Sequence, residues 1–224
     1  MEHLSVGLPG GGAVSGLLDT PPGATACFVL AHGAGAGMMH PFMTNVAEGL
    51  SAHGIATLRY QFPFIERGSK RPDRPETAHA AVRAAVETAS RLLPGVPLFA
   101  GGKSFGGRMT SQAQAERPLP GVHGLAFLGF PLHPVGKPSV ERARHLSDVM
   151  LPMLFLQGTR DALADATLIE TVVKGLGPRA TLFVFDDADH SFHVRTRAGR
   201  SDAAVLAALL DTLASWIGER RIGG

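Results

Sequence analysis

The sequence contains a single cysteine, Cys27, among its 224 residues. One cysteine cannot form an internal disulfide, so the fold does not depend on an oxidising compartment. Uninterrupted apolar stretches long enough to cross a bilayer are also missing, and the first residues lack the basic and apolar regions of a secretory signal peptide. We therefore expect a cytoplasmic protein without a membrane partner.

An excess of charge of one sign is missing as well. Lys and Arg total 21 and Asp and Glu total 19, which leaves a formal net charge of +2 at neutral pH. The densest basic stretches, Lys70-Arg71 and the segment 195–200, are short and interrupted. Because nucleic-acid binders gather positive charge on one face, we do not expect a nucleic-acid partner.

What the sequence does have is apolar residues, which make up 45% of it and indicate a folded core rather than disorder. Short apolar runs alternate with segments of helical period, which predicts the α/β class in one domain spanning residues 1–224. The runs are continuous, as in mostly parallel central sheets with helices on both faces. The expected strands are 27–31, 55–60, 98–100, 125–130, 153–156 and 181–185, with 14–18 as an antiparallel edge strand. The expected helices are 42–50, 78–93, 205–217 and one after Ser104, whereas 131–152 is irregular with at most one short helix.

The most informative motif is Gly102-x-Ser104-x-Gly106, which lies between an expected strand and an expected helix. A sharp strand-to-helix turn exposes one side chain, and flanking glycines relieve the crowding there, so Ser104 is the candidate nucleophile. Gly102-Lys103-Ser104 also resembles the end of a phosphate-binding loop, but the first position of that pattern is Pro97. The glycines at 33–37 do not complete a dinucleotide fingerprint either. We therefore expect no nucleotide cofactor.

A nucleophilic serine needs a base and an acid that orients the base, both on loops beside it. Asp161 follows the expected strand 153–156, and His190 follows 181–185, which gives the chain order Ser, Asp, His typical of α/β hydrolases. The other candidates are Asp165, which we place in the first turn of the next helix, Asp187, Asp189 and the alternative base His193. The remaining histidines show no metal-ligand spacing, so we expect no metal site.

The segment His32-Gly33-Ala34-Gly35-Ala36-Gly37 follows the first central strand and predicts an oxyanion hole. Glycines let backbone N–H groups approach a substrate oxygen without obstruction. We assign the two donors to the N–H groups of Ala34 and of Phe105, the residue after the candidate nucleophile. A tight structural turn is the alternative interpretation of this segment.

Four motifs together resemble the α/β-hydrolase superfamily, from about residue 14 to 217: His32-Gly33-Ala34-Gly35, Gly102-Lys103-Ser104-Phe105-Gly106, Gly158-Thr159-Arg160-Asp161 and Asp189-His190-Ser191-Phe192. The chain is similar to the small dienelactone-hydrolase-like branch. Segments 59–64 and 130–138 resemble a group related to testis-expressed protein 30. Dienelactone hydrolases proper use cysteine as nucleophile, whereas this chain has Ser104.

The predicted function is hydrolysis of a small acyl substrate (an ester, a thioester or an amide) through a Ser104–His190–Asp161 triad, without a cofactor. The alternative is a binding or scaffold protein that keeps the fold without turnover. Segment 131–152 is too short and polar for a sizeable lid, so we expect an open pocket that favours short acyl chains. Its expected walls are Phe62, Phe64, Phe105, Leu132 and Met38. Three cations near the site, at positions 103, 108 and 160, either brace loops or favour a carboxylate-bearing substrate. The oligomeric state is left open.

Overall fold

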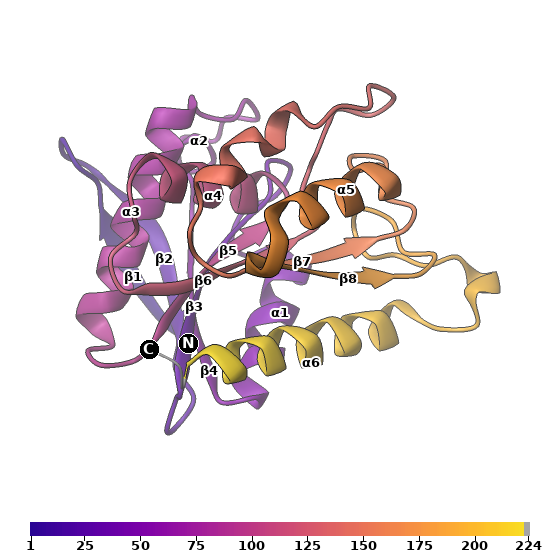
Figure 1. Cartoon of the computed structure of the whole chain (residues 1–224). Coiled ribbons are helices and arrows are strands. Elements are labelled where there is room, and N and C mark those ends of the chain that lie inside the picture. Colours follow the sequence, from indigo (N-terminus) through magenta and orange to yellow (C-terminus); the bar gives the residue numbers. More distant parts are fainter. Residues whose placement is uncertain (222–224) are drawn as a thin grey trace.

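The computed structural model describes residues 1–221. They form an eight-stranded sheet in the order β1-β2-β4-β3-β5-β6-β7-β8 (Figure 1). The pairs β1–β2 and β2–β4 are antiparallel, and all pairs from β4 to β8 are parallel. The strands are β1 (Glu2–Gly7), β2 (Ala13–Asp19), β3 (Ala26–Ala31), β4 (Ile55–Tyr60), β5 (Leu98–Lys103), β6 (Val122–Leu128), β7 (Met153–Gly158) and β8 (Ala180–Phe185).

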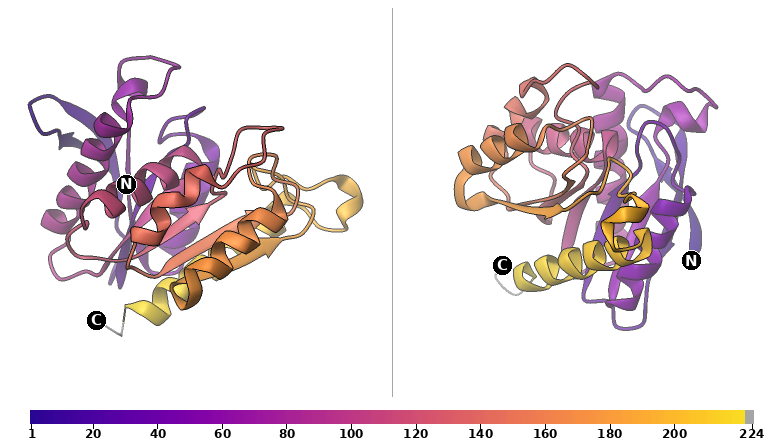
Figure 2. Two further views of the ribbon diagram at one scale, coloured as in Figure 1. Left: turned by 45° about the horizontal axis from the view of Figure 1, so that its top comes forward. Right: turned by 90° about the vertical axis from the view of Figure 1, so that its right-hand side faces the viewer.

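Helices cover both faces of this sheet (Figure 2). The α-helices are α1 (Pro41–Ala52), α2 (Pro63–Glu66), α3 (Pro75–Leu92), α4 (Phe105–Glu116), α5 (Ala166–Leu176) and α6 (Asp202–Arg220), and the 3-10 helices are η1 (Glu141–Asp148), η2 (Gly177–Arg179) and η3 (Thr196–Ala198). α1 and α6 bury their apolar sides in one core, whereas α3, α4 and α5 pack into a second core on the opposite face. Because both faces are covered, the central strands β3, β4 and β7 are buried along their whole length.

The predicted α/β class with a mostly parallel sheet is confirmed, with one difference at the edge of the sheet. The segment predicted as an edge strand is β2, which is antiparallel as expected but lies inside the sheet, between β1 and β4. The edge strand beside β2 is β1, which was not predicted from the sequence. Only Val6 of β1 is buried. The apolar pattern of β1 is therefore too weak to distinguish this strand from an exposed N-terminal segment.

The direction in which consecutive strands are added to the sheet reverses between β3 and β5, which are neighbours. Ligand sites of open α/β sheets lie beyond the carboxyl ends of the strands at such a switch point. The glycine-rich loop after β3 and the turn after β5 meet there, and the loops after β7 and β8 emerge from the same end. Among residues 1–221, no helix has the length and apolar content needed to cross a membrane.

Candidate active site

Ser104 occupies a strained turn between the end of β5 and the start of α4. Its φ is 49° and its ψ is −115°, a left-handed conformation that is rare for a residue with a side chain. The turn brings the backbone close to β3: a Cβ added to Gly102 would lie 2.1 Å from the carbonyl oxygen of Ala31, and one added to Gly106 would lie 2.5 Å from that of His32. Both motif glycines are therefore required sterically.

Ser104, His190 and Asp161 form one chain of hydrogen bonds. Nε2 of His190 lies 2.8 Å from Oγ of Ser104, and Nδ1 lies 2.7 Å from Oδ2 of Asp161. Because a carboxylate only accepts, Nδ1 carries the proton and Nε2 is free to accept from the serine hydroxyl. Asp161 is buried and also accepts from the backbone N–H of Leu163 at 2.8 Å and from Gln157 Nε2 at 2.5 Å. The His190 side chain is 23% exposed, so a substrate can reach it.

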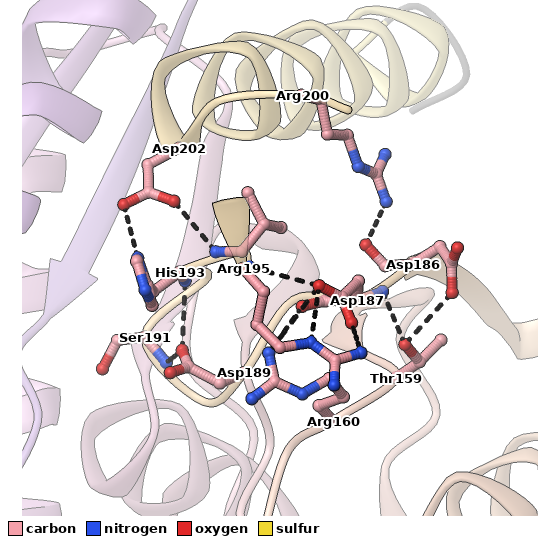
Figure 3. Close-up of polar contacts among 11 residues, drawn as sticks. Thr159, Arg160, Asp186, Asp187, Asp189, Ser191, His193, Arg195, Arg200 and Asp202 are labelled. Carbon is pink, nitrogen blue, oxygen red and sulfur yellow. Dashed lines mark hydrogen bonds and ion pairs between the residues drawn. The ribbon is translucent and has the colours of Figure 1, made fainter. Parts of the chain in front are cut away.

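The alternative base, His193, points toward Asp202 at the start of α6 (Figure 3). Its Nδ1 lies 2.7 Å from Oδ2 of Asp202, and its side chain is 61% exposed. The Asp189 carboxylate accepts from the backbone N–H groups of Ser191 and His193, at 2.8 and 3.0 Å. Asp189 therefore closes the turn that presents His190, rather than contacting the imidazole.

The remaining candidate acids have other partners. Asp187 forms an ion pair with Arg195, and its backbone carbonyl accepts from Arg160 at 3.1 Å (Figure 3). Asp165 caps α5 by accepting from the backbone N–H of Leu168 at 3.0 Å. The Arg160 interactions match the expected alternative in which this cation braces a loop.

The glycine-rich loop after β3 is held by the buried His32 side chain. Its Nε2 accepts from the backbone N–H of Phe62 at 2.9 Å, so Nδ1 carries the proton and donates to the carbonyl of Gly33 at 2.7 Å. Burial lowers the pKa of His32, which keeps the ring neutral. The loop brings Ala34 to the edge of the cavities around the serine, and Phe105 is the first residue of α4, where backbone N–H groups lack helical partners.

Lys103 stabilises the loop that carries His190. Its Nζ donates to the His190 backbone carbonyl over 2.5 Å and lies 5.5 Å from the centre of the Phe192 ring. Burial lowers the pKa of Lys103 to about 8, an effect that the charges of Asp161 and Asp189 oppose. Like Arg160, Lys103 therefore braces a loop.

Two cavities meet at Ser104. The first, about 480 Å³, includes His190 and is called the His190 cavity; it is lined by Gly33, Ala34, Gly35, Ala36, His40, Phe42, Met43, Lys103, Ser104, Leu163, His190 and Ser191. The second, about 370 Å³, is called the Arg108 cavity; it is lined by Ala34, Pro72, Asp73, Pro75, Ser104, Phe105, Arg108, Met109, Pro131, Arg142 and Leu163. Both volumes suit small molecules.

Four of the five expected substrate walls do not line either cavity. Phe62, Phe64 and Leu132 are fully buried and Met38 nearly so. The rings of Phe62 and Phe64 instead pack against Phe105, with centroids 5.2 and 6.0 Å apart, and support it from within the core. Phe105 alone among the expected walls reaches a cavity. The chain turns into α2 directly after β4, which directs these aromatic side chains inward.

The His190 cavity is also lined by Phe42, Met43 and Leu163, which were not predicted from the sequence. Phe42 follows the glycine-rich loop and stacks on Phe192 with ring centroids 5.9 Å apart. Phe42 could have been predicted as a lining residue, because it lies in the first turn of the helix that follows the glycine-rich loop. Leu163 lies two residues after Asp161, and nothing in the sequence distinguishes it from a core leucine.

Comparison with known proteins identifies the family to which the chain belongs. A family model described as an alpha/beta hydrolase domain matches residues 24–218. This chain belongs to that family. A dienelactone hydrolase from Anabaena variabilis has the same fold, with a TM-score of 0.78 and 23% identity over 98% of this chain and 97% of its own.

Two further α/β hydrolase structures superpose over nearly their whole length. A lid-less serine hydrolase from Xanthomonas campestris has a TM-score of 0.73 and 22% identity, over 96% of this chain and 94% of its own. A serine hydrolase homologue from Coxiella burnetii has a TM-score of 0.76 and 18% identity, over 96% of both chains. At these identities the similarity shows the α/β hydrolase fold. The finer resemblance to the testis-expressed protein 30 group stays a prediction.

Proposed function

We propose that this chain is a serine hydrolase of the carboxylesterase type that cleaves small acyl substrates through an acyl-enzyme. The observation that carries the proposal is the continuous hydrogen-bond chain from Oγ of Ser104 through His190 to Asp161. Ser104 also borders both cavities, where a substrate can place an acyl group and a leaving group on either side of it.

In the first step Ser104 attacks the substrate carbonyl while Nε2 of His190 takes its proton. The contact of 2.8 Å between these two atoms is within the range for direct proton transfer. Asp161 keeps the proton on Nδ1 beforehand and stabilises the imidazolium that forms. The hydrogen bonds from Gln157 and Leu163 hold the Asp161 carboxylate in place for this role.

The oxyanion that develops on the carbonyl oxygen needs preorganised donors. We assign them to the backbone N–H groups of Ala34 and Phe105, which belong to the two segments that meet beside Ser104. Loss of one such donor typically costs on the order of 3 kcal/mol of transition-state stabilisation. His32 fixes the first segment and the aromatic cluster under Phe105 supports the second.

His190 then gives its proton to the leaving group, and a water molecule activated by the same ring releases the acyl group. Each step uses only side chains and amides of this chain together with water. We place this activity in the cytoplasm, since the one cysteine, Cys27, is buried and free of a disulfide.

Labelling with a fluorophosphonate probe tests the proposal, because this reagent reacts only with an activated serine. We expect wild type to be labelled at Ser104 and to hydrolyse p-nitrophenyl butyrate, and Ser104→Ala to do neither while keeping its thermal midpoint. Ser111→Ala is the matched control, because Ser111 lies on α4 and lines neither cavity. An unlabelled wild-type protein would instead be a binding or scaffold protein that keeps the hydrolase fold.

A further inference from the structure

The Arg108 cavity contains a cation that the folded chain leaves without a counter-charge. Arg108 lies one helical turn after Ser104 on α4, and its backbone N–H donates to the Ser104 carbonyl at 3.1 Å. Among residues 1–221 its guanidinium forms no hydrogen bond and no ion pair, and its Nε is buried without a partner. A buried donor that lacks an acceptor is costly, and this one belongs to a side chain that lines a cavity beside the nucleophile.

A second arginine, Arg142, adds to the positive charge of the Arg108 cavity. Arg142 from η1 lines the same cavity and likewise has no ion-pair partner within the described chain. Burial, followed by the charge of Arg142, lowers the pKa of Arg108. The guanidinium also lies 6.0 Å from the centre of the Phe105 ring, which holds it beside the cavity without neutralising it.

The other titratable groups around the cavity do not supply the missing negative charge. Asp73 lines the cavity, but one carboxylate oxygen pairs with Arg67 at 2.6 Å and the other accepts from the backbone N–H of Phe64 at 2.8 Å. Burial, with the charge of Arg108 next in size, lowers the pKa of His145 to about 4, so this ring is neutral at physiological pH. An anion entering the cavity therefore meets two unpaired guanidinium groups.

The position of His190 indicates which half of the substrate enters this cavity. His190 must give its proton to the leaving group, so the leaving group lies on the His190 side of Ser104. His190 lines the His190 cavity and is absent from the lining of the Arg108 cavity. The acyl group therefore occupies the Arg108 cavity, and its far end reaches the two arginines.

We propose that the preferred acyl group is short and carries a carboxylate at its far end, as in monoesters of small dicarboxylic acids. Arg108 and Arg142 bind this carboxylate and so act as specificity-determining residues. Guanidinium groups suit this role because their planar donors match a carboxylate. The inference rests on the serine hydrolase activity proposed above and adds a substrate class to it.

The test compares monoethyl glutarate with ethyl valerate, which has the same acyl length and no charge, by titrating the acid released. Alkyl esters are used because the carboxylate of an activated aryl monoester attacks its own carbonyl. We expect wild type to prefer the anionic ester in kcat/KM by about tenfold or more, as for a hydrogen bond between charged groups. The preference should weaken as salt is added, because salt screens the attraction.

Arg108→Met and Arg142→Met should each lower the ratio of the two kcat/KM values by about tenfold, the loss expected for one charge-assisted contact. Arg144→Met is the matched control, since Arg144 also lies on η1 but is 75% exposed and pairs with Glu141 at 2.5 Å. It should leave the ratio at the wild-type value. Two variants are used so that a folding defect in one does not decide the outcome.

Two results would overturn the inference while leaving the proposed function intact. One is a wild-type protein that is labelled by the fluorophosphonate and hydrolyses ethyl valerate as fast as monoethyl glutarate. The other is an equal fall of the ratio in Arg144→Met, which would assign the preference to the overall charge of the surface. A wild-type protein that the fluorophosphonate does not label would, in contrast, contradict the proposed hydrolase activity itself.

Discussion

Gln157 donates a hydrogen bond from Nε2 to Oδ2 of Asp161 over 2.5 Å, and the same oxygen accepts from His190. The other end of the Gln157 amide accepts from the backbone N–H of Phe130 at 2.9 Å. Because the Gln157 side chain is only 1% exposed, water cannot replace either contact. One amide thus joins the Asp161 carboxylate to the chain segment that leaves β6.

Replacement of Gln157 by Leu should weaken both folding and catalysis. It leaves the Phe130 N–H buried without an acceptor, which costs about 1–3 kcal/mol of the free energy of unfolding. It also frees the Asp161 carboxylate to rotate, so we expect kcat to fall about tenfold, the equivalent of one hydrogen bond to a charged group. KM should stay near wild type because Gln157 lines neither cavity. Urea unfolding and steady-state kinetics measure the two effects.

Gln114→Leu is the matched control for this variant. Gln114 is also buried, and its side chain accepts from the backbone N–H of Leu119 at 2.8 Å, but it lies on α4 with no contact to the triad residues. It should lose stability and keep its kcat. If Gln157→Leu keeps the wild-type kcat as well, Gln157 is structural only.

Substitution of the two neighbouring histidines separates the base from its alternative. His190→Ala should lower kcat by a factor of about 10²–10⁴, the contribution of a positioned general base. His193→Ala removes an exposed side chain that pairs with Asp202, so its kcat should change less than about twofold. Initial rates with p-nitrophenyl butyrate measure both. The reverse order of effects would assign the base to His193.

The length of the acyl chain should matter only up to a limit. Each methylene buried against a cavity wall contributes up to about 0.8 kcal/mol of binding. The Arg108 cavity holds about 370 Å³ and ends among charged side chains. We expect kcat/KM for neutral p-nitrophenyl esters to stop rising at about butyrate or hexanoate. A steady rise to dodecanoate would instead indicate a deep acyl tunnel.

The buried Lys103 should make stability depend on alkaline pH. Its pKa is lowered from 10.5 to about 8, so between these values the unfolded chain binds a proton that the folded protein has lost. The contribution of Lys103 to the free energy of unfolding therefore rises with pH across this window, by at most about 1.4 kcal/mol per pH unit.

Lys103→Met removes this dependence, which urea unfolding at about pH 7.5 and about pH 10 can measure. The stability of wild type relative to Lys103→Met should be greater at the higher pH. Lys137→Met, which replaces an exposed lysine, is the matched control. An identical difference between wild type and Lys103→Met at both pH values would contradict the prediction.

The positions of Ser104, Asp161 and His190 could be predicted because each follows a recognisable apolar strand. Parallel strands end at one edge of the sheet, so residues that directly follow them come together whatever the intervening sequence is. The glycines around Ser104 added a second signal, because the close approach to β3 tolerates no Cβ at Gly102.

The lining of the cavities could not be predicted in the same way. Phe62 and Phe64 follow a strand just as Ser104 does, but α2 turns both rings into the core. Which side of the chain faces the site depends on the path of each loop, which the periodicity of helices and strands does not encode. Leu163 lies in the loop after β7, and Phe42 lies in the first turn of α1, directly after the glycine-rich loop.

The two cavities share only Ala34, Ser104 and Leu163. An acyl group bound to the serine and seated in the Arg108 cavity therefore leaves the His190 cavity empty once the alcohol has departed. Water reaches the acyl-enzyme by the exit route of the alcohol, and a second small alcohol can take the same path. In mixtures of water and methanol the protein should therefore transfer the acyl group to methanol in competition with hydrolysis, which is transesterification.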